Sequence, residues 1–190
     1  MLGDGSNAVT LTSASLSEKG LTVVGGMNTD SVSLNNSAVG GALKVAFKDG
    51  SNAATLTESS VGKAFAFAGG VNTDSVTLDD STLSGAAKFA LQAGSNSVDV
   101  EAGSFVGKTL TVTGKEGNDF VRLEENSTFD ADVKITLADG MNTVTLDTVT
   151  VNGDVKIKTG DGDDTITLAG EMVQGTTTID SGGGMDNVTP

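Results

Sequence analysis

The stretch DGSNAVTL at residues 4–11 recurs as DGSNAATL at 49–56, AGSNSVDV at 93–100, DGMNTVTL at 139–146 and, in acidic form, DGDDTITL at 161–168. Its glycine recurs at Gly5, Gly50, Gly94, Gly140 and Gly184, in steps of 45, 44, 46 and 44 residues. A fixed period of this length indicates a repeat architecture. The repeat is therefore expected to decide the fold.

Each step contains a second, offset copy about halfway along, such as GGMNTDSVSL at 25–34, GGVNTDSVTL at 69–78 and GNDFVRL at 117–123. The working unit is therefore about 22 residues, and two units form a super-repeat of 44–46 residues. Within a unit, apolar residues alternate with polar or small ones, as in Val9 and Leu11. Such alternation is typical of a strand with one buried face.

Strands this short bury little surface alone, but stacking equivalent strands buries a continuous core. The sequence predicts an all-β fold: a single right-handed parallel β-helix (β-solenoid) domain spanning residues 1–190, with about eight to nine coils. The right hand follows the usual preference of parallel crossovers. Because the chain starts at MLGDGSN and stops at GGGMDNVTP, inside repeats, both ends are expected to be uncapped.

Composition limits the possible partners. The chain has no Cys or His, and a net charge of −14 that would repel a phosphate backbone. Nucleic acid is therefore an unexpected partner. No apolar run reaches the roughly 18 residues needed to span a bilayer, so membrane insertion is not expected. The N-terminus lacks the basic and apolar regions of a signal peptide.

The glycine and asparagine of the repeat phrase are expected to form a structural corner. Glycine accepts positive φ at a tight turn, and stacked Asn side chains can bond to one another along a rod. The predicted turn and ladder residues are Gly5, Asn7, Asn28, Gly50, Asn52, Asn72, Gly94, Asn96, Asn118, Gly140 and Asn142.

The phrase G-x-N-x-V-T-L, followed by a small-residue turn and L-x-V, resembles the parallel β-helix repeats of large secreted bacterial surface and adhesin-like proteins. The resemblance covers essentially all of residues 1–190. It implies an extracellular or cell-surface location and a structural or adhesive scaffold role. The uncapped ends predict either flanking repeats of a longer chain or a second copy of the chain stacked head to tail as partners, and cell-surface glycans are a further candidate partner.

The turns TGDGDDTIT at 159–167 and GGGMDNVT at 182–189 look like the calcium-binding nonapeptide of RTX proteins. That resemblance implies Ca²⁺ held by carboxylate and carbonyl oxygens. Thr159 and Ser181 replace the first glycine of the two copies, and an acidic solvated corner is the alternative. The residues implied as calcium ligands are Asp161, Asp163, Asp164 and Asp186.

Two further functions remain as alternatives. A carbohydrate-binding β-helix would be favoured by an exposed aromatic row or a carboxylate cluster on one face. A polysaccharide-degrading one would need paired carboxylates, but Asp79 and Asp80 are neighbours in sequence, as are Glu124 and Glu125. Neighbouring strand positions point to opposite faces, so we do not expect an enzyme. An ice-binding face would need a regular T-x-T pair in each coil. Thr10/Thr12 and Thr55/Thr57 provide such a pair, but Ser33/Asn35, Thr77/Asp79 and Arg122/Glu124 do not.

Overall fold

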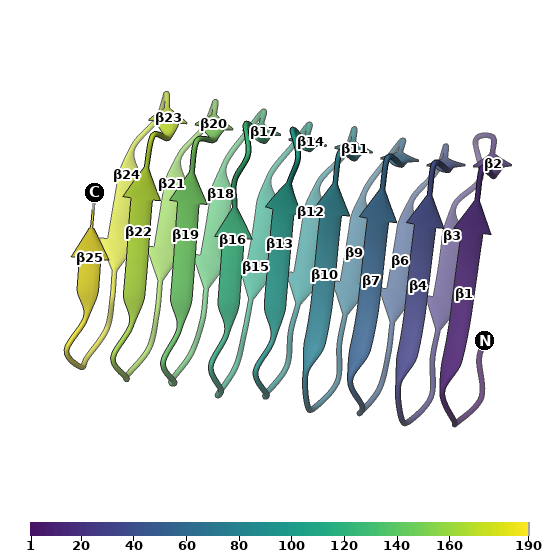
Figure 1. The fold of residues 1–190 in the computed structure, drawn as a ribbon, viewed down its shortest axis with the longest axis horizontal. Helices are drawn as coiled ribbons and strands as arrows, with labels where there is room; N and C mark the ends of the chain where they lie inside the picture. The colour runs from purple at the N-terminus through teal and green to yellow at the C-terminus, as the bar shows by residue number, and fades with distance from the viewer. Residues whose placement is uncertain (190) are drawn as a thin grey trace.

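The computed structural model describes residues 1–189, which form 25 strands and no helix. The strands make three parallel sheets, here called A, B and C, with nine, eight and eight strands. Figure 1 shows the sheets lying along a rod, with the strands across its long axis. The predicted all-β parallel solenoid is confirmed.

Sheet A contains β1 (Asn7–Thr12), β4 (Asp30–Asn35), β7 (Asn52–Thr57), β10 (Asp74–Asp79), β13 (Ser97–Glu101), β16 (Phe120–Leu123), β19 (Thr143–Asp147), β22 (Thr165–Ala169) and β25 (Asn187–Thr189). Sheet B contains the two-residue strands β2 (Ser15–Leu16), β5 (Ala38–Val39), β8 (Ser60–Val61), β11 (Thr82–Leu83), β14 (Phe105–Val106), β17 (Thr128–Phe129), β20 (Thr150–Val151) and β23 (Met172–Val173). Sheet C contains β3 (Leu21–Val24), β6 (Leu43–Ala46), β9 (Phe65–Ala68), β12 (Ala87–Ala90), β15 (Leu110–Thr113), β18 (Val133–Thr136), β21 (Val155–Lys158) and β24 (Thr177–Asp180).

One strand from each sheet makes a coil, and successive coils pair in register. Thus Val9 pairs with Val32, and Leu11 pairs with Leu34. In Figure 1 the chain climbs the front through β1, crosses at β2, descends behind through β3 and returns one coil further along. The coil is therefore right-handed, as predicted. At about 4.8 Å per strand, eight complete coils make a rod about 40 Å long.

The core is a set of apolar files that run along the rod. Leu34, Leu56 and Leu78 stack in register on the inner face of sheet A and are fully buried. Phe65 and Phe89 meet edge to face on sheet C, with ring centroids 5.2 Å apart. Because burying one such side chain contributes about 1.5–3 kcal/mol, stacking coils stabilises strands that are too short to be stable alone.

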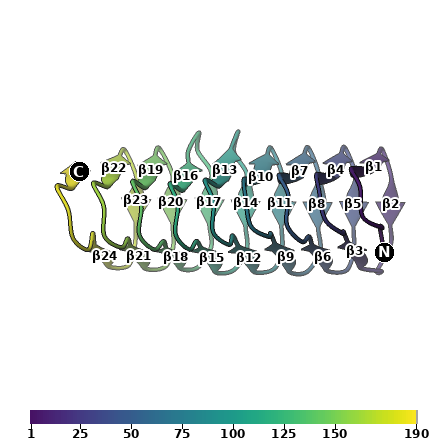
Figure 2. The ribbon, with the colours of Figure 1, turned by 90° about the horizontal axis from the view of Figure 1, so that it is seen from below.

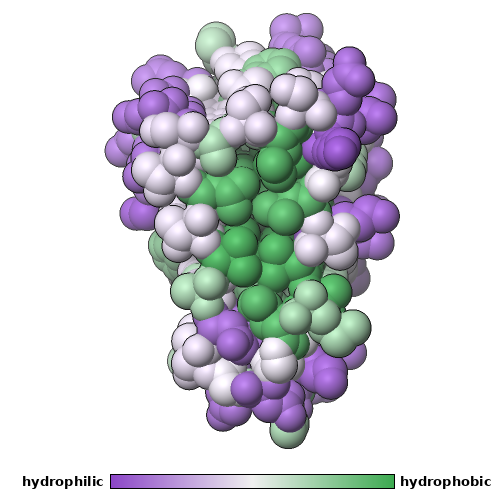
Figure 3. Space-filling model, turned by 90° about the vertical axis from the view of Figure 1, so that its right-hand side faces the viewer, coloured by the Kyte–Doolittle hydropathy of each residue, from purple (hydrophilic) through white to green (hydrophobic). Residues whose placement is uncertain are grey.

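The end of the rod that carries β1, β2 and β3 is open. Figure 3 looks onto this end and shows an apolar interior surrounded by polar side chains. Leu11, Leu16 and Leu21 face this interior and are only partly buried. The described residues include no helix long and apolar enough to cross a membrane.

Two coils protrude at the corner between sheets A and B. Val100 to Val106 and Leu123 to Phe129 are each one residue longer than the matching segment Leu78 to Leu83. The taller turns beside β13 and β16 are visible in Figure 2. The rest of this edge of the rod is nearly uniform.

Candidate functional site

The turn from sheet C to sheet A brings each coil close to the previous one. Gly50 and Gly94 have φ of 139° and 132°, a region that favours glycine. A Cβ at Gly50 would overlap the carbonyl oxygen of Asn28 in the previous coil. The predicted turn residues Gly5 and Gly140 have the same conformation, with φ of 111° and 136°.

Two residues after this turn position, the chain buries one polar side chain per coil. These side chains form a continuous file, which we call the corner file. Amide and carboxyl residues alternate along the file, except that its last two members are both carboxyl residues. Its members are Asn7, Asp30, Asn52, Asp74, Asn96, Asp119, Asn142, Asp164 and Asp186.

The predicted ladder divides into two groups. Four of its asparagines, Asn7, Asn52, Asn96 and Asn142, lie in the corner file. Asn28 and Asn72 do not: both are exposed and occupy the glycine position of the turn, with φ of 81° and 99°. Asn118 is also exposed, one residue before Asp119. The buried partners of the file asparagines are therefore aspartates, which sequence reasoning missed.

Hydrogen bonds link the file from coil to coil. Asn52 donates to Asp74 Oδ1 from both its backbone N and its Nδ2, at 3.2 and 2.9 Å. The backbone N of Asp74 in turn donates to Asn96 Oδ1 at 2.9 Å. Each Asn Nδ2 also donates to two carbonyls of its own turn, for example those of Lys48 and Gly50 for Asn52. The amides therefore tie each turn both to itself and to the next coil.

The aspartates are less well satisfied than the asparagines. The Oδ2 atoms of Asp30, Asp74, Asp119 and Asp164 are buried and have no hydrogen-bond partner. Burial raises the pKa of Asp74 to about 6, although the hydrogen bonds from Asn52 oppose this shift. Burial likewise raises the pKa of Asp119 to about 6, against the bonds from Asn96. The cause is the cost of placing a charge in a poorly solvated corner.

The space for the free oxygen comes from a glycine five residues earlier. A Cβ built at Gly69 would overlap Asp74 Oδ2, and one at Gly114 would overlap Asp119 Oδ2. The coils with Asn have a large apolar residue at this position, such as Phe47 before Asn52 and Leu91 before Asn96. Glycine at this position therefore accompanies Asp30, Asp74 and Asp119, whereas Thr159 and Ser181 precede Asp164 and Asp186.

The four residues predicted to bind calcium lie in two different environments. Asp164 is buried in the corner file, and its backbone N donates to Asp186 Oδ1 at 3.1 Å. Asp161 and Asp163 are exposed, and Asp163 Oδ1 accepts the backbone N of Met185 at 2.9 Å. Residues 1–189 contain no group of three or more Asp, Glu, His or Cys side chains placed to hold a metal ion.

A second polar file lies at the corner between sheets A and B, and it was not expected from the sequence. We call it the serine file: Ser37, Ser59, Ser81, Ser104 and Ser127, all buried. The backbone N of Ser59 donates to Ser81 Oγ at 3.1 Å, while Ser81 Oγ donates to the Asp79 carbonyl at 2.9 Å. The sequence does carry a serine at the same place in successive units. Because serine is also an ordinary turn residue, its burial was not predicted.

The outer face of sheet A carries one ionic cluster. Arg122 Nε lies 3.0 Å from Asp99 Oδ1 and 3.1 Å from Glu124 Oε1, and its guanidinium also faces Glu101. Burial raises the pKa of Glu101, against the opposing charge of Arg122. Arg122 also lies 5.9 Å from the centre of the Phe120 ring. These side chains are partly exposed, so the cluster contributes little to stability.

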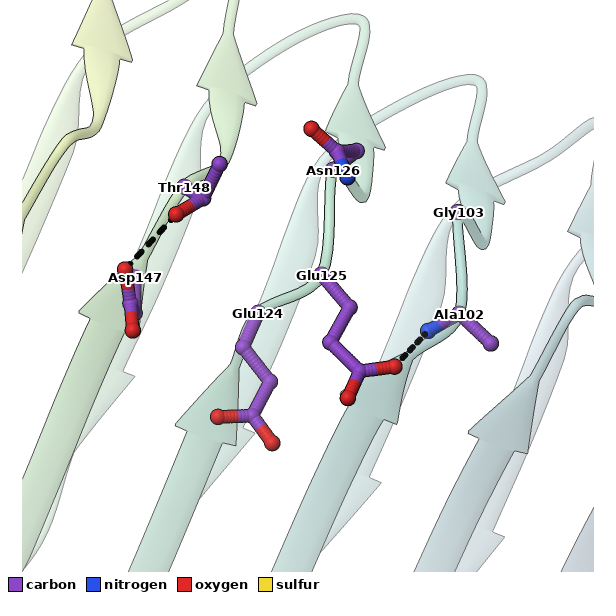
Figure 4. A pocket seen from close by; sticks show the side chains of 7 residues that line it. All are labelled: Ala102, Gly103, Glu124, Glu125, Asn126, Asp147 and Thr148. Atoms are coloured by element: carbon purple, nitrogen blue, oxygen red, sulfur yellow. Dashed lines mark hydrogen bonds between the residues drawn. The ribbon is translucent and has the colours of Figure 1, made fainter.

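The protruding turns border a shallow, open depression of about 660 Å³. Figure 4 shows that its acidic side chains are engaged separately. Glu125 Oε2 accepts the backbone N of Ala102 at 3.2 Å, and Thr148 Oγ1 donates to Asp147 Oδ1 at 2.7 Å. Glu124 contacts Arg122 instead. The depression is lined by Ala102, Gly103, Glu124, Glu125, Asn126, Asp147 and Thr148.

No protein-family model, no curated protein and no solved structure matches the chain.

Proposed function

We propose that the chain is a structural scaffold: a rigid rod that extends by stacking further parallel coils on its ends. The observation that carries this proposal is the open end formed by β1, β2 and β3. Within residues 1–189, the apolar files are covered there on one side only, and β1 pairs with β4 alone. Unpaired edges and exposed apolar surface favour the addition of another strand.

The opposite end has complementary character. Val173, Ile179 and Val188 are in register with the buried Val151, Ile157 and Ile166, but the last coil leaves them only partly covered, and Val188 is 44% exposed. Stacking one end on the other would place parallel strands beside parallel strands, which is a head-to-tail contact that continues as a filament. The occupant we propose for the open end is therefore the other end of a second copy.

The test is molar mass by light scattering across a concentration series. We expect the mass to rise with concentration. Leu11→Lys places a charge on the open apolar end and should hold the protein as a monomer. Thr10→Lys, on the outer face of the same strand, is the matched control and should still assemble. A wild-type monomer at every concentration would contradict end-to-end assembly.

Calcium is a separate proposal, supported by the acidic turns around Asp161 and Asp163. The same series is run with millimolar calcium and with chelator. Growth or compaction that requires calcium, and that is lost in Asp161→Asn/Asp163→Asn, would support ion binding there. Equal masses in both media would remove calcium from the scaffold proposal without affecting the stacking proposal.

We also propose an extracellular or cell-surface location, with an adhesive contribution through surface glycans. This rests on the resemblance of the repeat to bacterial surface proteins. Protease treatment of intact source cells is the test, because a surface rod is cleaved or released while an internal protein is protected.

A further inference from the structure

The corner file treats the two oxygens of each buried aspartate differently. Asp74 Oδ1 accepts two hydrogen bonds from Asn52, and Asp119 Oδ1 accepts two from Asn96. The Oδ2 atoms of the same carboxyls are buried and accept none. An ionised carboxylate has two acceptor oxygens, whereas a protonated one has a carbonyl and a hydroxyl oxygen. No donor reaches Oδ2, so an ionised carboxylate at this corner would leave one buried, charged oxygen without a hydrogen bond.

The surroundings of Oδ2 also disfavour a charge. The oxygen lies against the glycine five residues earlier, Gly69 for Asp74 and Gly114 for Asp119. Beside Gly114, the space is shared with the Leu137 side chain of the next coil. A charge facing glycine and leucine is poorly solvated, and the group then takes up a proton.

The nearby charged groups do not offset this. Asp49, on the turn of the preceding coil, raises the pKa of Asp74 further through its negative charge. Around Asp119, the charged groups on its own turn and the next are Lys115, Glu116 and Asp139, all exposed. The backbone of Gly70 and the side chain of Asn52 lower the pKa of Asp74, but burial outweighs them.

We infer that Asp74 and Asp119 are held as neutral carboxylic acids, protonated at Oδ2, and that the rod is a pH-sensitive element, stable in acid and loosened at this corner as pH rises toward neutral. The inference concerns the stability of each coil and does not depend on end-to-end stacking.

The direction follows from proton linkage. The pKa of both carboxyls rises from 3.8 in the unfolded chain to about 6 in the folded rod. The stabilisation is therefore fully present below about pH 4 and is lost as pH rises through about 6. For each carboxyl, the unfolding equilibrium constant increases by about 100-fold across this window.

The test is urea unfolding, followed by circular dichroism, between about pH 4.5 and pH 8. We expect the wild-type midpoint to fall across this range. The double variant Asp74→Asn/Asp119→Asn cannot ionise and should show a much flatter curve. The matched control Asp80→Asn/Glu58→Gln removes two exposed acids from the other corner and should keep the wild-type slope. A flat wild-type curve, or an equal slope in the Asp74/Asp119 variant, would overturn the inference.

Carbon-13 NMR of the aspartate carboxyls in the wild-type protein is a second readout, which needs no variant to fold. The carboxyl resonances of Asp74 and Asp119 should titrate near pH 6. If both titrate near the ordinary aspartate value of 3.8, burial does not favour their neutral forms and the inference is wrong.

Discussion

The two polar corners of the rod both link neighbouring coils by hydrogen bonds, but they use different side chains to do so. In both, a backbone N–H of one coil donates to a side-chain oxygen of the next, as Asp74 does to Asn96 and Ser59 does to Ser81. The serine file uses neutral hydroxyls, and those of Ser37, Ser59 and Ser81 each donate to the carbonyl two residues earlier. The corner file inserts a carboxyl in alternate coils and leaves one of its oxygens unpaired. Stacking coils therefore does not require an acid, and the acid adds a response to pH that hydroxyls do not provide.

Removing one amide from the corner file should have the largest effect. Asn96→Ala deletes the hydrogen bonds that Nδ2 donates to Asp119 Oδ1 and to the carbonyls of Gln92 and Gly94. It also removes the oxygen that accepts the backbone N–H of Asp74. We expect a loss of about 3–5 kcal/mol in the free energy of unfolding, measured by urea unfolding. The loss should be greater at pH 8 than at pH 5, because the missing donors stabilise the ionised form of Asp119. An equal loss at both values would contradict this account.

Filling the glycine space should have the next largest effect. Gly69→Ala places a methyl group where Asp74 Oδ2 lies, and we expect a cost of about 1–3 kcal/mol. The second change Asp74→Ser shortens the side chain and should recover part of that cost, which a double-mutant cycle measures. If the two effects simply add, the overlap is not the cause.

The serine file should be less costly to break. Ser81→Ala removes the acceptor of the Ser59 N–H and the donor to the Asp79 carbonyl. We expect a loss of about 1–2 kcal/mol that is the same at pH 5 and pH 8. A loss that changes with pH would mean that the two corners do not differ as proposed.

The smallest expected effect is a gain. Thr148 has a positive φ of 56°, which is unfavourable for a β-branched residue, at the point where Val149 interrupts the serine file. Thr148→Asn should stabilise the rod by about 0.5–1 kcal/mol, seen as a raised melting temperature. Glu58→Asn, at an equivalent turn with φ of 48°, should give a gain of similar sign. Destabilisation by both would show that these backbones are not strained.

The repeat period and the alternation of apolar residues were enough to predict the coil length, the strands and the parallel stacking. They were enough because each inward residue, such as Leu56, has the same neighbours in every coil. The corner file was harder to predict. In GSN at residues 50–52 the asparagine is buried, but in MNTD at residues 27–30 the asparagine replaces the turn glycine and the aspartate is buried. Asparagine suits both positions, so residue type alone misplaced Asn28 and Asn72, whereas counting 22 or 23 residues along the chain finds Asp30 and Asp74.

The serine file and the Arg122 cluster show a different limit of sequence reasoning. Serine is common in turns, so nothing in its type distinguishes the buried Ser81 from the exposed Ser84. The contacts of Arg122 with Asp99 and Glu101 depend on which coil lies beside which, at a separation of 21 or 23 residues. Only the register of stacked strands brings these groups together.

The orientation of the backbone hydrogen bonds has a mechanical consequence. They run from coil to coil along the rod, so tension applied to the two termini loads them along their own direction, and coils peel away one at a time from an end. Each released coil gives up about 4.8 Å of rod but frees about 22 residues, which extend to roughly 70–80 Å. Under load, the rod would therefore lengthen in steps, one coil at a time, before the extended chain itself is strained.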